Sequence, residues 1–241
     1  MRGVFVAGTD TEVGKTIVAA AVVAALAARG EKVAAFKPAV TGIDEDPPDG
    51  WARDHELLAS VANAGQSGED VSPHRYGPPV SPHYAAELAG EQIEPTELLA
   101  KARNAADHAD ALVCEGVGGL LVPLTPGYLI RDLALDLNLP LVIAARPGLG
   151  TINHTLLTLE AARTAGLDVR GVVMTPWRQE PMAESNRKTV ELIGNVAVTW
   201  LPPLQRADLA EAGARLPLGD WLGDDLPGIQ EKGPEGELGS A

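Results

Sequence analysis

The segment that most constrains the fold is residues 8–16, which read GTDTEVGKT. It follows a short apolar run at residues 4–7 and precedes a long alanine-rich stretch, which predicts a helix beginning near Lys15. A glycine-containing turn between a strand and a helix is typical of a phosphate-binding loop, because backbone N–H groups and the helix dipole attract an anion there. In such a loop the Lys15 side chain reaches the outer phosphates and the Thr16 hydroxyl can bind Mg²⁺.

The spacing of this loop is unusual. Five residues separate Gly8 from Gly14, whereas the common phosphate-binding loop has four at this place. The alternative is a glycine turn that only caps a helix. The Lys-Thr pair at the helix start, directly after an apolar strand, favours phosphate binding.

Apolar runs and helical patterns alternate almost to the end of the chain, and this predicts an α/β fold. We expect a doubly wound, mostly parallel sheet of the P-loop NTPase type, in a single domain over residues 1–222. The apolar runs are continuous, as expected for strands that are buried on both faces. The predicted strands are residues 3–8, 32–36, 110–115, 140–145, 168–174 and 196–200. The predicted helices are residues 15–29, 54–63, 95–107, 129–137, 151–165 and 181–194. Residues 38–53 and 65–83 are predicted loops, and residues 223–241 are predicted to be an acidic, disordered tail.

Composition excludes several classes of protein. The formal net charge of -14 argues against a general nucleic-acid-binding protein, which needs a basic surface. The single cysteine, Cys114, excludes an internal disulfide and a cysteine zinc site, and its apolar strand predicts a buried thiol. No signal peptide and no membrane-spanning segment are visible, because the apolar run at residues 17–28 stops at Arg29 and is typical of a buried helix. We therefore expect a cytoplasmic protein that binds neither nucleic acid nor membrane.

Ligands of parallel sheets bind beyond the carboxyl ends of the strands, so the residues that follow each strand are the candidates for the site. Lys37 follows the second predicted strand and would bring a second cation near Lys15, although a solvated surface lysine is the alternative. Glu115 ends the third strand and is a natural Mg²⁺ partner, and the glycines after it, Gly118 and Gly119, allow close approach of a ligand. Asp54 begins a helix, where it either caps and stabilises the helix or supplies a second metal carboxylate. The alternative to the site at Glu115 is an exposed glycine-rich turn.

A second glycine turn into a helix lies at residues 148–154, which read GLGTINH. By the same argument as for the first turn, it is a second candidate anion site, able to take a carboxylate or a phosphate.

Taken together, these segments resemble the dethiobiotin synthetase family, over about residues 3–202. The matching motifs are GTDTEVGKT at 8–16, KPAVTG at 37–42, Asp54 at the start of its helix, SPHYAAELAG at 81–90, CEGVGGLLVPL at 114–124 and GLGTINHTLLT at 148–158. The five-residue spacing of the phosphate-binding loop is this family's own. The tail has no recognised counterpart.

The resemblance implies an ATP-dependent ligase of biotin biosynthesis. CO₂ adds to one amine of 7,8-diaminopelargonate to give a carbamate, ATP phosphorylates the carbamate, and the second amine closes the cyclic urea, releasing ADP and phosphate. It also implies a homodimer with the substrate across the interface.

The resemblance assigns roles to individual residues. The expected catalytic residues are Lys15, Lys37 and Thr11, and the expected Mg²⁺ ligands are Thr16, Asp54 and Glu115. Residues expected at the nucleotide are Glu12, Val13, Gly14, Lys15, Thr16, Ile17, Asp54, Glu115, Gly118, Thr175, Pro176, Pro203 and Leu204. Residues expected at the diamine and carbamate are Thr41, Ser81, Pro82, Gly118 and Gly119, and those expected at the substrate carboxylate are Gly150, Thr151, Ile152 and Asn153.

The chain departs from this family after the fifth predicted strand. The family often has an Asn-Asp pair there whose amide reads adenine, whereas this chain has Thr175 and Pro176. Neither presents the donor and acceptor of an amide side chain. We therefore expect a relaxed base preference, with CTP or other nucleoside triphosphates able to replace ATP.

Two rival functions share this kind of loop. One is the ATP domain of a corrinoid amidotransferase-type synthetase, but this chain has no room for the glutaminase domain and its cysteine lies in a strand. The other is a partner-binding P-loop NTPase switch, which usually carries an extra lysine early in the loop. Residues 9–13 here are TDTEV, which contain no lysine.

Overall fold

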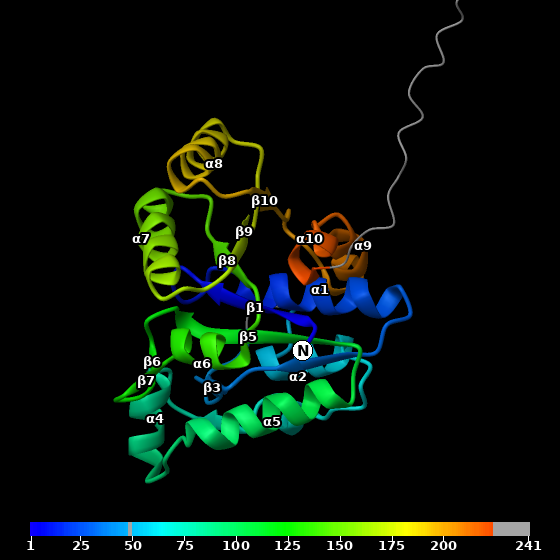
Figure 1. The fold of residues 1–241 in the computed structure, drawn as a ribbon, viewed down its shortest axis with the longest axis vertical. Coiled ribbons are helices and arrows are strands. Elements are labelled where there is room, and N and C mark those ends of the chain that lie inside the picture. Colours follow the sequence, from blue (N-terminus) through cyan, green and yellow to red (C-terminus); the bar gives the residue numbers. More distant parts are fainter. Residues whose placement is uncertain (48–49, 224–241) are drawn as a thin grey trace, which may run out of the picture.

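The computed structural model describes residues 1–47 and 50–223, and its centre is a six-stranded parallel sheet (Figure 1). The strands run in the order β10-β9-β8-β1-β5-β2, so β1 lies in the middle, between β8 and β5. These are the six strands predicted from the sequence, which confirms the α/β fold. Their bounds are β1 Gly3–Gly8, β2 Val33–Phe36, β5 Ala111–Gly119, β8 Leu141–Ala145, β9 Val169–Met174 and β10 Val198–Trp200. Most of the predicted tail, residues 224–241, lies outside the described residues.

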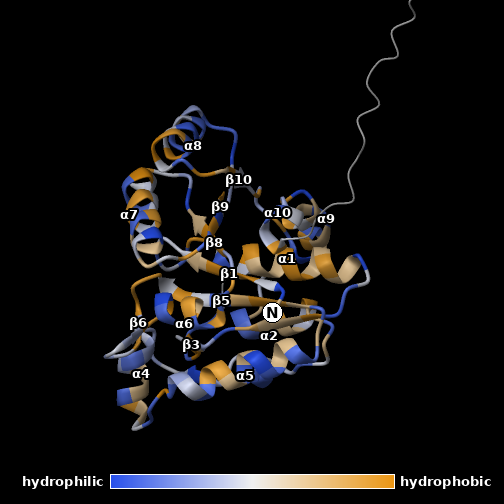
Figure 2. Cartoon of the chain, viewed as in Figure 1, coloured by the Kyte–Doolittle hydropathy of each residue, from blue (hydrophilic) through white to orange (hydrophobic). Residues whose placement is uncertain are grey.

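Helices cover both faces of the sheet, as in a doubly wound fold. One face packs against α1 Lys15–Ala28, α2 Asp54–Val61, α9 Leu209–Ala214 and α10 Leu218–Leu222. The other face packs against α5 Pro95–Asp107, α6 Ile130–Leu137, α7 Thr151–Thr164 and α8 Pro181–Gly194. Figure 2 shows α1 as largely hydrophobic, as expected for a helix that lies against the sheet and is covered by α9. Of the helices in the described part of the chain, none combines the length and the hydrophobicity needed to cross a membrane.

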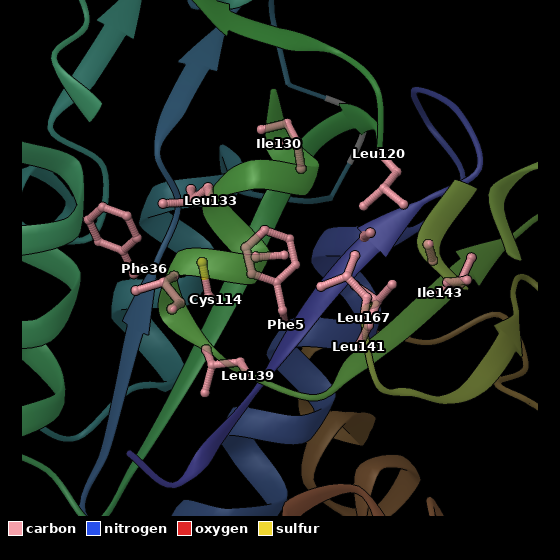
Figure 3. Close-up of a cluster of buried hydrophobic side chains, with 14 of the residues drawn as sticks. Phe5, Phe36, Cys114, Leu120, Ile130, Leu133, Leu139, Leu141, Ile143 and Leu167 are labelled. Carbon is pink, nitrogen blue, oxygen red and sulfur yellow. The ribbon is translucent and has the colours of Figure 1, made fainter. Parts of the chain in front are cut away.

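Strand β1 connects the two halves of the core. Phe5 and Ala7 belong to the cluster beneath α5 to α8, whereas Val4 and Val6 belong to the cluster beneath α1. This alternation is the two-residue period of a strand that is buried on both faces. Figure 3 shows Phe5 among side chains from β5, α6 and β8, and Cys114 is fully buried there, as predicted.

The two segments predicted as loops contain regular structure, which corrects that prediction. Within them, β3 Ala39–Thr41 pairs in parallel with β4 His74–Tyr76, and the short helix α3 Gly68–Val71 precedes β4. Strands of three residues have no measurable period, and their pairing joins segments far apart in the sequence, so local patterns do not reveal them. Other elements absent from the prediction are α4 Pro82–Ala89, β6 Pro123–Thr125, β7 Tyr128–Leu129, the 3₁₀-helix η1 Arg206–Asp208, α9 and α10.

Candidate active site

The phosphate-binding loop joins β1 to α1 and is anchored to its neighbouring strands. The Thr9 N–H donates to the Ala144 carbonyl on β8 over 3.0 Å. Gly14 immediately precedes α1 with φ 87°, a conformation that favours glycine. A Cβ at position 14 would also collide with the Thr175 methyl group, so this turn is packed directly against the end of β9.

Asp10 organises the tip of this loop, and sequence reasoning missed it. Its backbone carbonyl accepts a hydrogen bond from Lys15 Nζ at 2.7 Å, and its carboxylate accepts one from the Thr11 N–H, also at 2.7 Å. The guanidinium of Arg146 lies 3.7 Å from the same carboxylate. Arg146 follows β8, so the strand-end rule that selected Lys37 applies to it as well.

Four predicted residues meet in one charged cluster. Lys37 Nζ lies 2.9 Å from an Asp54 carboxylate oxygen and donates to Glu115 Oε1, and the Thr16 hydroxyl donates to the same Glu115 oxygen over 2.9 Å. Lys37 and Glu115 are 3% and 0% exposed, so Lys37 is not the solvated surface lysine of the alternative interpretation. Arg53 is the N-cap of α2, so Asp54 does not cap that helix; it lies in the first turn, where a carboxylate favours the helix dipole, and it also contacts Lys37.

Burial and mutual attraction set the protonation of these groups. Burial alone would lower the pKa of Lys37, but Asp54 and Glu115 outweigh it and raise the pKa above its usual value. Partial burial opposes ionisation of Asp54, yet Lys37 holds its pKa below the usual range. Burial raises the pKa of Glu115 despite Lys37, whereas burial and repulsion from Lys37 lower the pKa of Lys15 to about 8. Lys37 is therefore the fixed cation of the cluster, and Lys15 is the cation that an arriving anion stabilises.

The donor set of this cluster fits Mg²⁺ that is also bound by phosphates. Glu115 Oε2 is buried and has no hydrogen-bond partner, so it is an available hard oxygen ligand next to Thr16. Within residues 1–47 and 50–223, no group of three or more histidine, cysteine or acidic side chains is arranged to hold a metal ion by itself. Two carboxylates and one hydroxyl suffice for Mg²⁺ when phosphate oxygens and water complete its shell.

The glycines at the end of β5 lie beside the phosphate-binding loop. Gly119 pairs with Gly8 in the register between β5 and β1, and a Cβ on Gly118 would lie 3.7 Å from the Thr11 methyl group. Within the loop, Val13 is buried, while Glu12 is exposed with φ 54° and Ile17 is half-buried on α1. This part of the predicted nucleotide and carbamate site is therefore contiguous.

Thr41 and the segment Ser81–Pro82 also lie close together, since Thr41 ends β3 and α4 packs against β3 and β4. The second glycine turn lies between β8 and α7. Gly150 precedes α7 with φ 91°, and Asn186 on α8 holds the turn by donating to the carbonyls of Pro147 and Gly148. In the described part of the chain, no hydrogen bond or ion pair joins Thr151, Ile152 or Asn153 to the charged cluster.

The residues predicted at the base lie on two connected loops. Thr175 and Pro176 follow β9, while Pro203 and Leu204 follow β10. The Trp177 N–H donates to the Leu201 carbonyl over 2.7 Å and so joins the two loops.

Comparison with known proteins agrees with this geometry. A family model for an AAA domain matches residues 2–207. The chain is 35% identical over 205 residues to the ATP-dependent dethiobiotin synthetase BioD of Bacillus subtilis (strain 168), covering 84% of this chain and 87% of that protein. It is 44% identical over 174 residues to the protein of the same name from Anaeromyxobacter dehalogenans (strain 2CP-1), covering 72% and 76%. Among solved structures, the cell division ATPase MinD of Pyrococcus furiosus superposes with a TM-score of 0.54 at 17% identity, covering 89% of this chain and 96% of that one, which shows a shared fold.

Proposed function

Because the chain belongs to the family of ATP-dependent dethiobiotin synthetases, which are ligases of biotin biosynthesis, we propose that it converts 7,8-diaminopelargonate, CO₂ and ATP into dethiobiotin, ADP and phosphate. The reaction forms a carbamate on one amine, transfers the terminal phosphoryl group of ATP to it, and closes the urea ring as the second amine displaces phosphate. We expect the reaction to take place in the cytoplasm, where ATP is supplied.

One observation carries this proposal: two lysines meet at a single phosphate-binding loop, Lys15 bonded to the loop carbonyl of Asp10 and Lys37 bonded to Asp54 and Glu115. Lys37, with its raised pKa, keeps its proton and can neutralise charge on the carbamate and its phosphorylated form. Lys15 is held by a loop carbonyl and can transfer its hydrogen bond to the outer phosphates. Thr11 and the N–H groups of Gly118 and Gly119 would position the carbamate, so orientation and preorganised charge would supply most of the rate.

The residues that would hold Mg²⁺ are Thr16, Asp54 and Glu115. Their fit depends on the unpartnered Glu115 oxygen and on the Thr16 hydroxyl that adjoins it. When bound, Mg²⁺ would supply charge neutralisation between the outer phosphates.

The substrate carboxylate provides a reason to propose a homodimer. Its predicted turn at residues 150–153 has no polar contact with the charged cluster of the same chain, so a turn from a second copy would complete the site. Leu149 beside the turn is 96% exposed and Leu157 on α7 is 57% exposed, which suits an apolar contact between copies. Thr41, Ser81 and Pro82 would line the rest of the diamine pocket.

A product assay tests the proposed function. The purified protein is incubated with Mg²⁺, ATP, bicarbonate and the diamine, and dethiobiotin is measured by mass spectrometry. We expect product and ADP to form together and to require the diamine and bicarbonate. ATP hydrolysis that ignores both substrates, without product, would instead indicate the partner-binding switch.

A further inference from the structure

The positions of the charged cluster and of Thr175 give the nucleotide a direction across the sheet. Lys37 follows β2, Glu115 lies on β5 and Asp54, which begins α2, contacts Lys37, so the cluster lies on one side of the loop that leaves β1. A cation that bridges the outer phosphates belongs on that side, so the base must lie on the other side, toward β9 and β10. Thr175, whose methyl group touches Gly14, ends β9 there. This step depends on the proposed function, because it assumes a nucleoside triphosphate in the loop.

The base therefore meets a rim formed by residues 175–177 after β9 and residues 201–204 after β10. Backbone hydrogen bonds make this rim rigid: the Thr175 N–H donates to Ala145, the Leu201 N–H to Met174 and the Trp177 N–H to Leu201, over 2.9, 3.1 and 2.7 Å. The rings of Trp177 and Trp200 stack with centroids 5.8 Å apart and hold the same two strand ends together. The polar groups that the rim offers to a base are thus fixed before a base arrives.

Most of the backbone groups that remain unbonded are acceptors. Three of the seven residues, Pro176, Pro202 and Pro203, have no N–H, and the N–H groups of Thr175, Trp177 and Leu201 are already bonded. The Leu204 N–H is the one backbone donor of the rim that remains. In contrast, six carbonyl groups of the rim accept no hydrogen bond, those of Thr175, Pro176, Trp177, Pro202, Pro203 and Leu204.

An acceptor-rich rim distinguishes bases by their exocyclic group. Adenine and cytosine carry an amino group that donates two N–H bonds, with a ring nitrogen beside it that can accept from the Leu204 N–H. Hypoxanthine and uracil carry a carbonyl oxygen at the same position, which would face other carbonyls and lose its hydrogen bond with water. We propose that this rim selects nucleoside triphosphates whose base has an amino group at the purine 6-position or the pyrimidine 4-position, so that ATP and CTP both serve as phosphoryl donors.

The experiment compares two pairs of nucleotides that differ at that group and at the ring nitrogen beside it, which carries a hydrogen in the keto base and can then no longer accept from the Leu204 N–H. Values of kcat/KM for dethiobiotin formation are measured with ATP against ITP and with CTP against UTP. We expect each amino nucleotide to exceed its keto partner by at least about 10-fold, because the keto oxygen would face carbonyl groups and leave its hydrogen bond unmade. ATP and CTP should differ from each other by less than either differs from its keto partner. The matched controls are 7-deaza-ATP, which keeps the pairing edge and should behave as ATP, and N6,N6-dimethyl-ATP, which lacks both N–H groups and should behave as ITP.

Equal use of all four nucleotides would overturn the proposal, as would a CTP rate no better than the UTP rate. Binding of ADP, IDP, CDP and UDP, measured by calorimetry, separates this failure from failure of the proposed function. Preferential binding of ADP and CDP without dethiobiotin formation would reject the ligase activity and keep the rim's selectivity. Dethiobiotin formation with equal binding of all four diphosphates would keep the ligase activity and reject the rim's selectivity.

Discussion

At the scale of single residues, Lys37 is the cation between two carboxylates, and replacing it tests its role directly. In Lys37→Met the fold should remain, while the turnover for dethiobiotin should fall at least about 100-fold, as for loss of one preorganised charge at a reacting group. Turnover is measured at saturating ATP and diamine, with a thermal melt to verify folding. Lys32→Met is the matched control, because Lys32 is exposed and precedes the strand that Lys37 follows. Near-normal turnover of Lys37→Met would remove this residue from the mechanism.

Gly14 gives a second prediction at this scale, because its conformation and its surroundings both restrict the side chain. Gly14→Ala should lower the free energy of unfolding by more than Gly30→Ala. Both positions have φ near +88° and carry the same backbone cost of about 1 kcal/mol, but a Cβ at position 30 meets nothing within 4 Å. The excess, about 1–3 kcal/mol from overpacking against the Thr175 methyl group, is measured by urea unfolding without nucleotide.

A double variant identifies the source of that excess. Thr175→Ser removes the methyl group that a Cβ on residue 14 would strike, so it should recover much of the stability lost in Gly14→Ala. If Gly14→Ala costs no more than Gly30→Ala, the close packing of the loop against the end of β9 is wrong.

The site residues that could be predicted from the sequence are those that stand at the carboxyl end of a predicted strand. Lys37 follows a strand of the parallel sheet, and Glu115 ends the strand predicted at residues 110–115, so one rule selected both, although the structure extends this strand to Gly119 and places Glu115 within it. Arg146, which follows β8, satisfies the same rule, so the sequence could have predicted it as a site residue. The bond between Lys15 and the Asp10 carbonyl could not be predicted, because it depends on the path of the loop backbone.

At the scale of elements, α9 lies unusually close to α1. A Cβ on Gly213 would strike the Ala21 carbonyl oxygen and lie 2.9 Å from the Ala25 methyl group. Gly213→Ala should therefore separate the two helices and lower the free energy of unfolding by about 1–3 kcal/mol. Glu211→Ala, an exposed change in the same helix, should stay within about 0.5 kcal/mol in the same denaturation experiment. If Gly213→Ala left the free energy of unfolding unchanged, this close packing would be contradicted.

The elements that sequence predicts well are those whose burial is uniform. The run at residues 141–145 is apolar throughout because helices cover both faces of β8, and such runs are recognisable without alignment. In contrast, α9 and α10 are six and five residues long, too short for a helical period to emerge from the sequence. Their helical state depends on packing against α1 and β1, which only the assembled fold supplies.

At the scale of the whole molecule, the predicted site residues fall into two groups that no hydrogen bond or ion pair of the described residues joins. The phosphate-binding loop, the charged cluster and the β5 glycines form one contiguous surface, while the turn predicted for the substrate carboxylate adjoins α7 and α8. Sequence order could not reveal this separation, because all of these segments follow strands of the same sheet. A second copy that brings its own turn to the charged cluster is the arrangement that we propose to unite them.

Sedimentation of wild type and variants tests this arrangement. We expect wild type to have the mass of two chains, and Leu149→Asp with Leu157→Asp to have the mass of one, because each aspartate would bury an unpaired charge in the contact. The double variant should still bind ADP, since its phosphate-binding loop is unchanged, but it should lose affinity for the diamine. Leu192→Asp is the matched control: Leu192 is 83% exposed on α8, six residues after Asn186, which holds the turn, and its variant should remain dimeric and active. A monomeric wild type with full activity, or a double variant that keeps the mass of two chains, would show that one chain carries a complete site or that the contact lies elsewhere.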